Sequence, residues 1–564
     1  MIARADAVSA MAAEEFDVVV VGGGITGAGV ALDASTRGYS VALVERHDFA
    51  GGTSSRSSKL VHGGLRYLQS FDLGLVREAL LERQIMVALA PHLVRPLPLI
   101  VPAFDGARPD RMMGMGLNLY DVMSVDKLRS PLRRRGRAGA GTGVDDAAAT
   151  TTSWSPDRHR VIDAGEVAEG LPALAARDPT SGYLFYDCQT DDSRLVLTVL
   201  GEAERFGAVC ANGLLVTELI EEGGRACGVR VLDAVSGEAF AVRAANVVNA
   251  TGVWADRLRP EELHDAAEVP VIRPSRGTHV TFRREDLPLN AGAIVPAGGG
   301  RFIFALPWLG GSLVGTTDTD DDATDLDHVK PADDDVEYLL DAVNAFFATD
   351  LTASDIAGAF AGVRPLISCA DAGKSVDISR KAELYETSSG MVTITGGKLT
   401  TWRRMAKMAV DRLVEREARD APCRTHEIPL GQAIEVGELP RVPGVRDDAY
   451  APLAARYGHA AHDVLAIAAQ RGELAQPIVA GQPDLLAEVV HAARREQART
   501  VGDVLLRRTR LGLVAARDVT AHGGEVAHRI AAAMAPETGW DAAGVRRAAE
   551  AFRVEAAAER IVPG

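Results

Sequence analysis

Residues 16–27, FDVVVVGGGITG, decide how the N-terminal part of this chain folds. After the opening Phe-Asp pair the run is all valine, which is typical of a strand buried on both faces of a parallel sheet. Gly22, Gly24 and Gly27 then give the spacing G-x-G-x-x-G, and a helical pattern continues to Arg37. A strand, a glycine turn and a helix in this order predict a dinucleotide-binding unit.

Each glycine of this turn has a separate physical role. Gly22 permits the tight turn, Gly24 lets the backbone approach a pyrophosphate, and Gly27 lets the helix pack against the strand. The free N–H groups and the dipole of the helix then point at the phosphates. We therefore expect cofactor contacts from Gly22, Gly24, Ile25, Thr26 and Gly27.

An acidic residue follows the second predicted strand. Residues 41–44 (VALV) read as another buried strand, and Glu45 comes eighteen positions after Gly27. A carboxylate there can accept hydrogen bonds from both ribose hydroxyls, and it disfavours a 2′-phosphate. Glu45 and its neighbour Arg46 are therefore candidate cofactor-binding residues. The alternative, an ordinary glycine-rich loop, leaves the surrounding strand, helix and acid without an explanation.

Length, composition and charge exclude several classes of protein. A chain of 564 residues is expected to form two or three domains, and its 47% hydrophobic content can fill a large core. The net charge of −16 argues against nucleic-acid binding, and neither a membrane span nor a secretory signal is apparent. The five scattered cysteines predict reduced thiols. The acidic stretch 318–327 lacks the spacing of a calcium loop, so we expect a solvated loop and no metal site.

Residues 51–67 (GGTSSRSSKLVHGGLRY) are too long and too polar for a simple strand connection. Small hydroxyl residues and paired glycines suit a backbone that lies along a bound ligand, although a flexible surface loop has the same composition. The GTSSRSSK and HGGLRY motifs resemble the FAD-dependent, quinone-linked glycerol-3-phosphate dehydrogenases of respiration. The resemblance implies FAD contacts from Thr53, Ser54, Ser58, Lys59, His62, Gly63 and Gly64.

Later motifs extend the resemblance over about residues 17–403. Residues 247–252 (VVNATG) resemble the strand and glycine turn by which two-dinucleotide-fold flavoproteins return to the adenine end of FAD. Thr251 and Gly252 are therefore further expected contacts. A strand that returns so far along the chain favours FAD over a diffusible nicotinamide.

Three short motifs follow in the family's order: VRPL at 363–366, SR at 379–380 and GGKLTT at 396–401. The last looks like a phosphate loop, but G-x-x-x-x-G-K-[ST] is not met. We expect instead a cradle of backbone amides at the isoalloxazine edge, where a helix N-terminus can stabilise negative charge on the reduced flavin. The contacts expected there are Gly397, Lys398, Leu399 and Thr400.

The resemblance implies oxidation of sn-glycerol 3-phosphate to dihydroxyacetone phosphate, with hydride passing to flavin N5. The substrate phosphate needs a cationic clamp, and arginine suits it because a planar guanidinium matches phosphate oxygens. The family match points to Arg66, Arg364 and Arg380 for this clamp, with Tyr67 as a hydroxyl partner.

His279 is the candidate proton acceptor, because imidazole titrates near neutral pH. His62 competes for that role, and a strand histidine satisfied by its neighbours is the structural alternative for His279. Lys398 is expected to place positive charge beside the substrate or the flavin. His279, Arg364 and Lys398 thus form the predicted catalytic set, and all three are also expected to contact substrate.

The expected fold class is α/β: an FAD-binding Rossmann-like two-dinucleotide-fold domain with an inserted antiparallel β substrate domain and an all-α C-terminal domain. The oxidoreductase region is expected at 14–436 and the helical domain at 448–564. The FAD-binding segments are placed at about 14–95, 185–270 and 355–415, and the substrate-domain segments at about 96–184 and 271–354. Within the second FAD-binding segment we expect a helix capped by Asp192 or Ser193.

Electrons are expected to pass to a quinone, from a cytoplasmic protein attached peripherally to the inner face of the cell membrane. The basic run at 127–137 has six cations and no acid, which favours anionic lipid, although a solvated loop is the alternative. The methionine-rich helix predicted at 112–123 either packs in the core or touches lipid. The C-terminal helices are expected to form a cap or a homodimer interface.

Three other functions stay open at this point. An oxidase would hand electrons to oxygen, and nothing in the sequence separates that acceptor from quinone. An amino-acid or amine oxidase of the same superfamily would use an arginine like Arg364 to bind a carboxylate. A flavin-binding regulatory protein would have no turnover at all.

Overall fold

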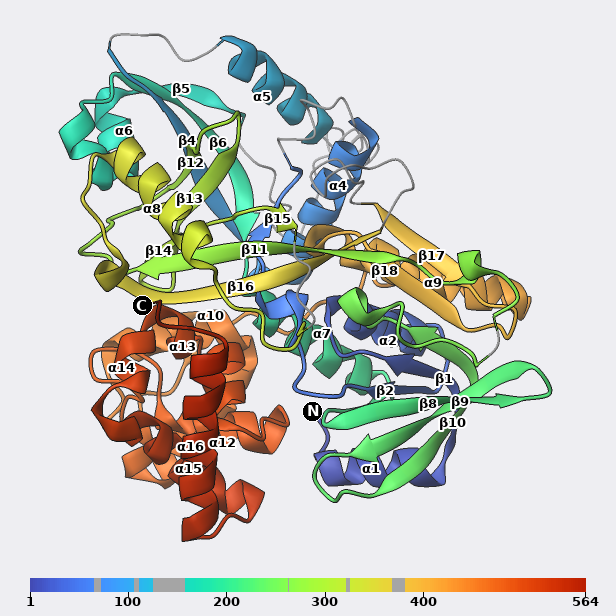
Figure 1. The fold of residues 1–564 in the computed structure, drawn as a ribbon. Coiled ribbons are helices and arrows are strands. Elements are labelled where there is room, and N and C mark those ends of the chain that lie inside the picture. Colours follow the sequence, from blue (N-terminus) through green and yellow to red (C-terminus); the bar gives the residue numbers. More distant parts are fainter. Residues whose placement is uncertain are drawn as a thin grey trace, which may run out of the picture.

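The computed structural model describes residues 1–64, 73–105, 111–124, 158–261, 263–320, 325–367 and 381–563. Within these residues the chain forms two β-sheets and a C-terminal group of helices (Figure 1). Sheet A contains the predicted N-terminal strand. Sheet B lies beside it, and the C-terminal helices pack against sheet B.

Sheet A has a parallel centre formed by three predicted strands. β1 (Glu15–Val21) lies between β2 (Val41–Val44) and β10 (Ala239–Asn249), in parallel with both. β7 (Val209–Ala211) continues the sheet beyond β2, and β18 (Val392–Gly396) continues it beyond β10. Antiparallel strands complete it: β17 (Ala382–Glu386) beside β18, and β9 (Arg225–Asp233) with β8 (Leu214–Glu222) beside β10.

Alternate residues of β1 enter different cores, because both faces of sheet A are covered. Val18 and Val20 pack in one core with residues of several helices, and Val19 and Val21 pack in another with α1 and the β8–β9 pair. The helices of the first core include α2 (Ile25–Thr36), α7 (Asp192–Arg205) and α9 (Trp402–Arg416), and α1 spans Arg4–Ala13. This double burial explains why the strand is apolar throughout, as predicted.

Sheet B is mostly antiparallel, as predicted for the substrate domain. Its spine is β11 (Ile272–Phe282), which pairs along its whole length with β16 (Ile356–Ile367). β12 (Gly292–Pro296) and β4 (Arg95–Ala103) form a parallel pair within it. The remaining strands are β3 (Leu60–Val61), β5 (Arg160–Asp163), β6 (Ser181–Gln189), β13 (Phe302–Trp308), β14 (Gly311–Gly315) and β15 (Thr319–Asp320). α6 (Ala164–Gly170) and α8 (Asp333–Phe347) cover its outer end.

Three elements, β3, β16 and α7, differ from the sequence expectation. β3 and β16 lie in segments assigned above to FAD binding, yet both belong to sheet B. There β3 pairs with β6 and β16 pairs with β11, each in the antiparallel direction. The residue that caps α7 is Asp191 rather than Asp192 or Ser193, since its Oδ1 accepts from the N–H of Arg194 at 3.1 Å. The domain limits themselves stay predictions.

The C-terminal region is mainly helical, with one isolated β-bridge between Pro477 and Leu485. Its core includes Trp308, Leu313 and Phe360 of sheet B, so the helices are packed against that sheet. The helices are α10 (Tyr450–Tyr457), α11 (Ala461–Gln470), α12 (Leu486–Arg495), α13 (Leu511–Val514), α14 (Ala516–Thr520), α15 (Glu525–Thr538) and α16 (Ala542–Ala558). A π-helical turn, Asp503–Arg508, precedes α13.

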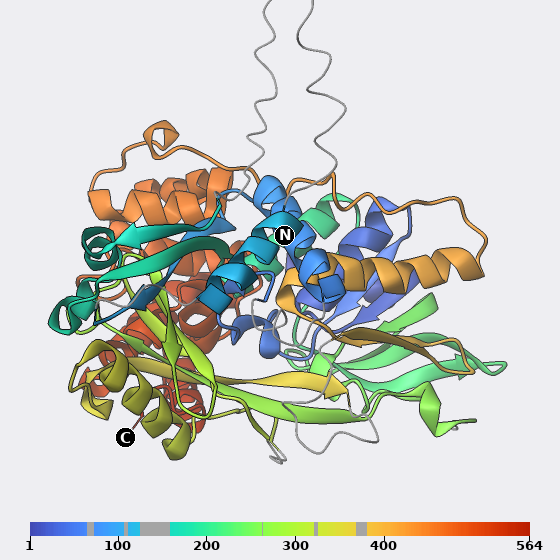
Figure 2. The ribbon, with the colours of Figure 1, turned by 90° about the horizontal axis from the view of Figure 1, so that it is seen from above.

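Two further helices lie over the junction of these parts. Seen from above, α4 (Leu73–Leu89) and α5 (Arg111–Ser124) lie near the middle of the molecule (Figure 2). Side chains on one side of α5 are exposed, among them Met115 at 67% and Val122 at 70%. None of the helices in the described ranges combines the length and apolar character that crossing a membrane needs.

Candidate functional site

The predicted glycine turn lines a cavity of about 390 Å³ at the carboxyl ends of β1 and β2. Residues from distant parts of the chain meet there: the turn itself, the end of β10 and the end of β18. Of the predicted cofactor contacts, those that line it are Gly22, Gly24, Ile25, Thr26, Glu45, Arg46, Thr53, Ser54, Thr251, Gly252, Gly397, Lys398 and Leu399. The structure therefore brings most of the predicted set together.

The backbone of the turn leaves no room for side chains. Gly22 has φ +113°, and a Cβ on it would lie 2.6 Å from the carbonyl oxygen of Ala250. A Cβ on Gly27 would lie 1.9 Å from the carbonyl oxygen of Gly22. Both glycines are thus fixed by steric contact. Gly24 directly precedes α2, and it lines the cavity together with the first residues of the helix. The positive end of the helix dipole is therefore directed at the cavity.

Glu45 and Arg46 line the cavity beside the glycine turn. Glu45 Oε2 accepts from the N–H of Gly23 at 2.7 Å, and its Oε1 accepts from the N–H of His47 at 2.9 Å. The Arg46 guanidinium lies 4.3 Å from the ring centroid of Trp254 and pairs with Asp327. These two hydrogen bonds fix the carboxylate of Glu45, and Glu45 lines the cavity.

The segment after Gly51 joins the cavity to sheet B. Ser54 Oγ accepts from the N–H of Ile25 at 2.9 Å, and Thr53 Oγ1 donates to the carbonyl of Val363 at 2.6 Å. Further along, Ser58 Oγ lies 2.9 Å from Nε2 of His279. Lys59 does not line the cavity, because its fully buried ammonium donates to Asp192 at 2.8 Å.

His279 is buried in sheet B with only 2% of its surface exposed. Its ring stacks on Phe360 at 4.8 Å, and its Nδ1 has no hydrogen-bond partner among the described residues. Burial, and then the cations of Lys59 and Arg364, hold the pKa of His279 well below its usual range. The imidazole is therefore neutral near pH 7, which is the form that can accept a proton.

Arg364 lies on the same face of sheet B as His279. It pairs across the ladder with Ser275, and Ser275, Gly277 and His279 alternate along β11 toward one face. Gly277 makes room for the guanidinium, since a Cβ there would lie 2.7 Å from Nη2 of Arg364. Asp318 pairs with Nη1 at 3.3 Å. The side chain is thus braced and still 22% exposed.

The GGK turn has the backbone that the sequence predicted. Gly396 and Gly397 have φ +78° and +64°, and a Cβ on Gly397 would lie 2.5 Å from Sδ of Met405. Lys398 lines the cavity, and a short 3₁₀ turn, Leu399–Thr401, leads into α9. Thr400 does not line the cavity, since its Oγ1 accepts from the N–H of His62 at 3.2 Å.

The remaining predicted residues fall into two groups. His62, Gly63 and Gly64 lie beside α4 and α5, where a Cβ on Gly63 would be 2.7 Å from the hydroxyl of Tyr120. They do not line the cavity, and neither do Ser58 and Gly27. Arg66, Tyr67 and Arg380 lie outside the described residues, as does the basic run 127–137.

Sequence reasoning missed the charged residues behind the site. The acidic stretch 318–327 was expected to be solvated, yet its first and last members, Asp318 and Asp327, pair with Arg364 and Arg46. Asp192 pairs with Lys59 and Arg510, which are 133 and 318 positions away. The nearest sequence signal was the run of arginines at 507–510, which lacks the regular apolar spacing of a surface helix.

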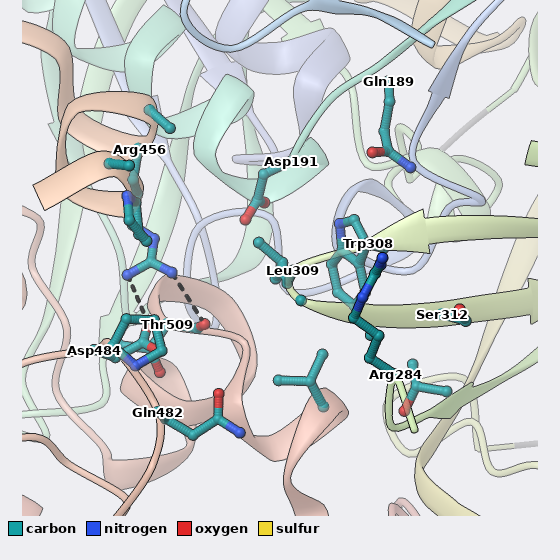
Figure 3. Close-up of a pocket in the computed structure, with 18 of the residues that line it drawn as sticks. Gln189, Asp191, Arg284, Trp308, Leu309, Ser312, Arg456, Gln482, Asp484 and Thr509 are labelled. Carbon is teal, nitrogen blue, oxygen red and sulfur yellow. Dashed lines mark hydrogen bonds and ion pairs between the residues drawn. The ribbon is translucent and has the colours of Figure 1, made fainter. Parts of the chain in front are cut away.

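A second cavity, of about 960 Å³, lies between sheet B and the C-terminal helices (Figure 3). Arg456 and Asp484 face it from the helical side, and Trp308 and Leu309 face it from sheet B. Asp191, the cap of α7, also lines this cavity. None of the predicted site residues within the described part of the chain lines this cavity.

Two known families match this chain, one over its N-terminal and central part and the other over its C-terminal part. Residues 17–412 match the family described as FAD dependent oxidoreductase, and residues 394–545 match the C-terminal domain of alpha-glycerophosphate oxidase. The first match covers more than half of the chain. FAD as the cofactor and the fold class predicted from the sequence are therefore confirmed.

Individual relatives extend over nearly the whole chain. Glycerol-3-phosphate dehydrogenase 2 of Mycobacterium tuberculosis is 38% identical over 98% of this chain and 90% of that protein. A probable mitochondrial glycerol-3-phosphate dehydrogenase of Caenorhabditis elegans is 34% identical over 96% of this chain and 73% of that protein. The crystal structure of the Bacillus halodurans glycerol-3-phosphate dehydrogenase with FAD superposes with a TM-score of 0.76 at 28% identity, covering 100% and 98% of the two chains.

Proposed function

Because this chain belongs to the FAD-dependent glycerol-3-phosphate dehydrogenase family, we propose that it oxidises sn-glycerol 3-phosphate to dihydroxyacetone phosphate. The observation that carries the proposal is the placement of His279 and Arg364 on one face of sheet B. Pro365, the next residue of β16 after Arg364, lines the sheet A cavity, so Arg364 is adjacent in sequence to the wall of the cofactor site. A neutral base and a phosphate-binding cation are the two groups that this oxidation requires of the protein.

The residues of the sheet A cavity fit FAD. Glycines with no room for a Cβ leave the backbone open to a pyrophosphate, and the N-terminus of α2 provides N–H groups and positive potential. Glu45 offers a fixed carboxylate for ribose hydroxyls. The GGK turn also lines the cavity, where it provides backbone amides and the cation of Lys398.

When bound, FAD would supply the redox chemistry by accepting hydride from C2 of the substrate at flavin N5. His279 would take the hydroxyl proton at Nδ1, the buried ring nitrogen that needs a partner. Arg364 would bind the substrate phosphate and fix C2 relative to that nitrogen. Lys398 would add positive charge beside the reacting atoms. Arg66, Arg380 and Tyr67 stay predicted members of the clamp.

A quinone is the electron acceptor that we propose, with oxygen as the alternative. The quinone assignment is supported by the relatives named as dehydrogenases. The alternative is favoured by one observation, the match of residues 394–545 to a domain of alpha-glycerophosphate oxidase. Reduced enzyme mixed with a soluble quinone and, separately, with oxygenated buffer separates the two acceptors by the rate of flavin reoxidation.

Peripheral attachment to the inner face of the cell membrane follows from a quinone acceptor, because quinones partition into lipid. The exposed side of α5, with Met115, Leu119 and Val122, is an apolar surface that could meet lipid. Co-sedimentation with anionic liposomes, before and after deletion of residues 127–137, tests this attachment. A cytoplasmic homodimer also stays a prediction, which light scattering would check.

The oxidation itself is tested by anaerobic titration. We expect glycerol 3-phosphate to bleach the flavin absorbance fully, and glycerol, amino acids and primary amines to leave it unchanged. Bleaching by an amine but not by glycerol 3-phosphate would reassign the chain to an amine oxidase. A flavin that no member of the panel reduces would identify a binding protein without turnover.

A further inference from the structure

The loop that carries Ser58 is held from behind by a buried cluster of charges. Asp192 Oδ2 accepts from the N–H of Ser57 at 3.0 Å, from its hydroxyl at 2.7 Å and from Nζ of Lys59 at 2.8 Å. Lys59 also donates to the carbonyl of Ser55 at 2.6 Å. Asp192 and Lys59 are completely buried, so residues 55–59 are fixed to the start of α7.

An arginine of the C-terminal helical region completes this cluster. Arg510 is completely buried and donates to Asp192 as well as to Asp191, at 3.0 Å for the latter. Its Nη1 lies 3.3 Å from the carbonyl oxygen of Ser55. Arg510 has φ +67°, a backbone conformation that a bulky residue adopts at a cost.

A second ion pair fixes the same loop to the end of the described chain. Arg56 pairs with Glu559 at 2.6 Å and donates to the carbonyl of Ala361 on β16 at 3.3 Å. Residues 55–59 are therefore held between α7, sheet B and the C-terminal region. Charges buried this deeply stabilise a fold weakly, because desolvation offsets most of their attraction, and positional specificity is their better-attested use.

The loop so held makes one contact with the predicted base. Ser58 Oγ is 2.9 Å from Nε2 of His279, and no other described residue is hydrogen-bonded to that ring. The partner of one imidazole nitrogen decides which nitrogen carries the proton. When Nε2–H donates to Ser58, Nδ1 keeps its lone pair for the substrate proton, so this is the tautomer that the proposed reaction requires.

We propose that Arg510 is a positioning residue for the oxidation, acting through Asp192 and the 55–59 loop to hold Ser58 against His279. The inference rests on the proposed role of His279 as the base. It gives the C-terminal region a part in catalysis, although no described residue of that region lines the cofactor cavity. Displacing a base by about 1 Å costs on the order of 100-fold in rate, so a remote clamp can matter.

The test compares R510K with R194M in the FAD-loaded enzyme. Arg194 is a matched control, because it also joins α7 to the C-terminal region through a buried ion pair, with Glu496, without touching the 55–59 loop. We expect R510K to lower kcat by on the order of 10- to 100-fold while KM for glycerol 3-phosphate and FAD content stay at the wild-type level. R194M is expected to lower thermal stability but to leave kcat unchanged.

A double mutant identifies the route of the effect. S58A should lower kcat to a similar degree, and R510K/S58A should be no slower than the slower single variant. Trypsin supplies a measurement independent of turnover, since cleavage after Arg56 should appear in R510K but not in R194M. Wild-type kcat in R510K, equal losses in R510K and R194M, or additive losses in the double mutant would each overturn the inference.

These outcomes are distinct from a failure of the proposed function. If wild-type protein does not oxidise glycerol 3-phosphate, or if H279A keeps full turnover, the assignment of the base is wrong. In that case the trypsin result alone would still report whether Arg510 holds the loop. If H279A is inactive and R510K is normal, only the inference fails.

Discussion

The cofactor cavity of sheet A and the His279–Arg364 face of sheet B are built in different ways. In sheet A the shape is set by backbone: glycines with positive φ or with no space for a Cβ, and a helix N-terminus. On sheet B the shape is set by side chains, each of which is braced by a partner from a distant segment. The first site should therefore fail by steric exclusion of the cofactor, and the second by loss of alignment with the cofactor still bound.

The largest effect is expected from Gly27→Val. The side chain would meet the carbonyl of Gly22 at 1.9 Å, which forces the turn away from β1. We expect complete loss of bound flavin, measured as visible absorbance per mole of protein. Gly201→Val is the matched control, because that glycine is also helical and has open space around it. Normal flavin content in Gly27→Val would contradict the steric account.

Arg364→Ala should break the other site and leave the first intact. We expect kcat/KM for glycerol 3-phosphate to fall on the order of 100- to 1,000-fold, because a phosphate-binding cation is lost and its ion pair with Asp318 is broken. FAD content should not change. Arg273→Ala is a suitable control, since Arg273 forms a 2.9 Å pair with Asp320 on the same sheet. Equal losses in both variants would argue against a specific clamp.

The pH profile should show which cations act on His279. A neutral base with a depressed pKa keeps kcat/KM level as pH falls through the usual histidine range, and activity is lost only below its own pKa. Because the Arg364 cation lowers that pKa, Arg364→Gln should move the acid limb to higher pH, and Arg364→Lys should move it less. An unmoved limb would show that the titrating group is not beside Arg364.

The smallest effect is expected from Ser54→Ala. This change leaves the N–H of Ile25 without its 2.9 Å acceptor at the start of α2. We expect a loss of about 1 kcal/mol in the free energy of unfolding, as for other capping bonds, with flavin still bound. Thermal denaturation of the apoprotein measures it. A loss of flavin as complete as in Gly27→Val would show that side chains also set the shape of the sheet A cavity.

The predictability of the two sites follows from the same difference. β1, α2 and β2 were predicted almost to the residue, because valine runs, glycine spacing and periodicity are local signals. The contacts of Asp192 could not be predicted, since Lys59 and Arg510 reach it from opposite ends of the sequence. The misplaced cap of α7 has the same origin, because two adjacent aspartates share the helix start and the fold gives each a separate role.

The predicted catalytic set was only partly predictable from the sequence. Arg364 came from the family resemblance and His279 from the titration range of imidazole, and their shared face became visible only with the register of β11 and β16. Their roles stay predictions. The same holds for Lys398 and for Arg66, Tyr67 and Arg380, the last three of which lie outside the described residues.

The pairing of Arg56 with Glu559 has a consequence for how the protein is made. The loop at residues 55–59 leaves the ribosome early, but its last anchor is synthesised some five hundred residues later. Domains usually acquire structure in order of synthesis, from the N-terminus onward. Here the glycine turn can pack against β10 once residue 249 has emerged, whereas Arg56 stays without this anchor until translation is nearly finished.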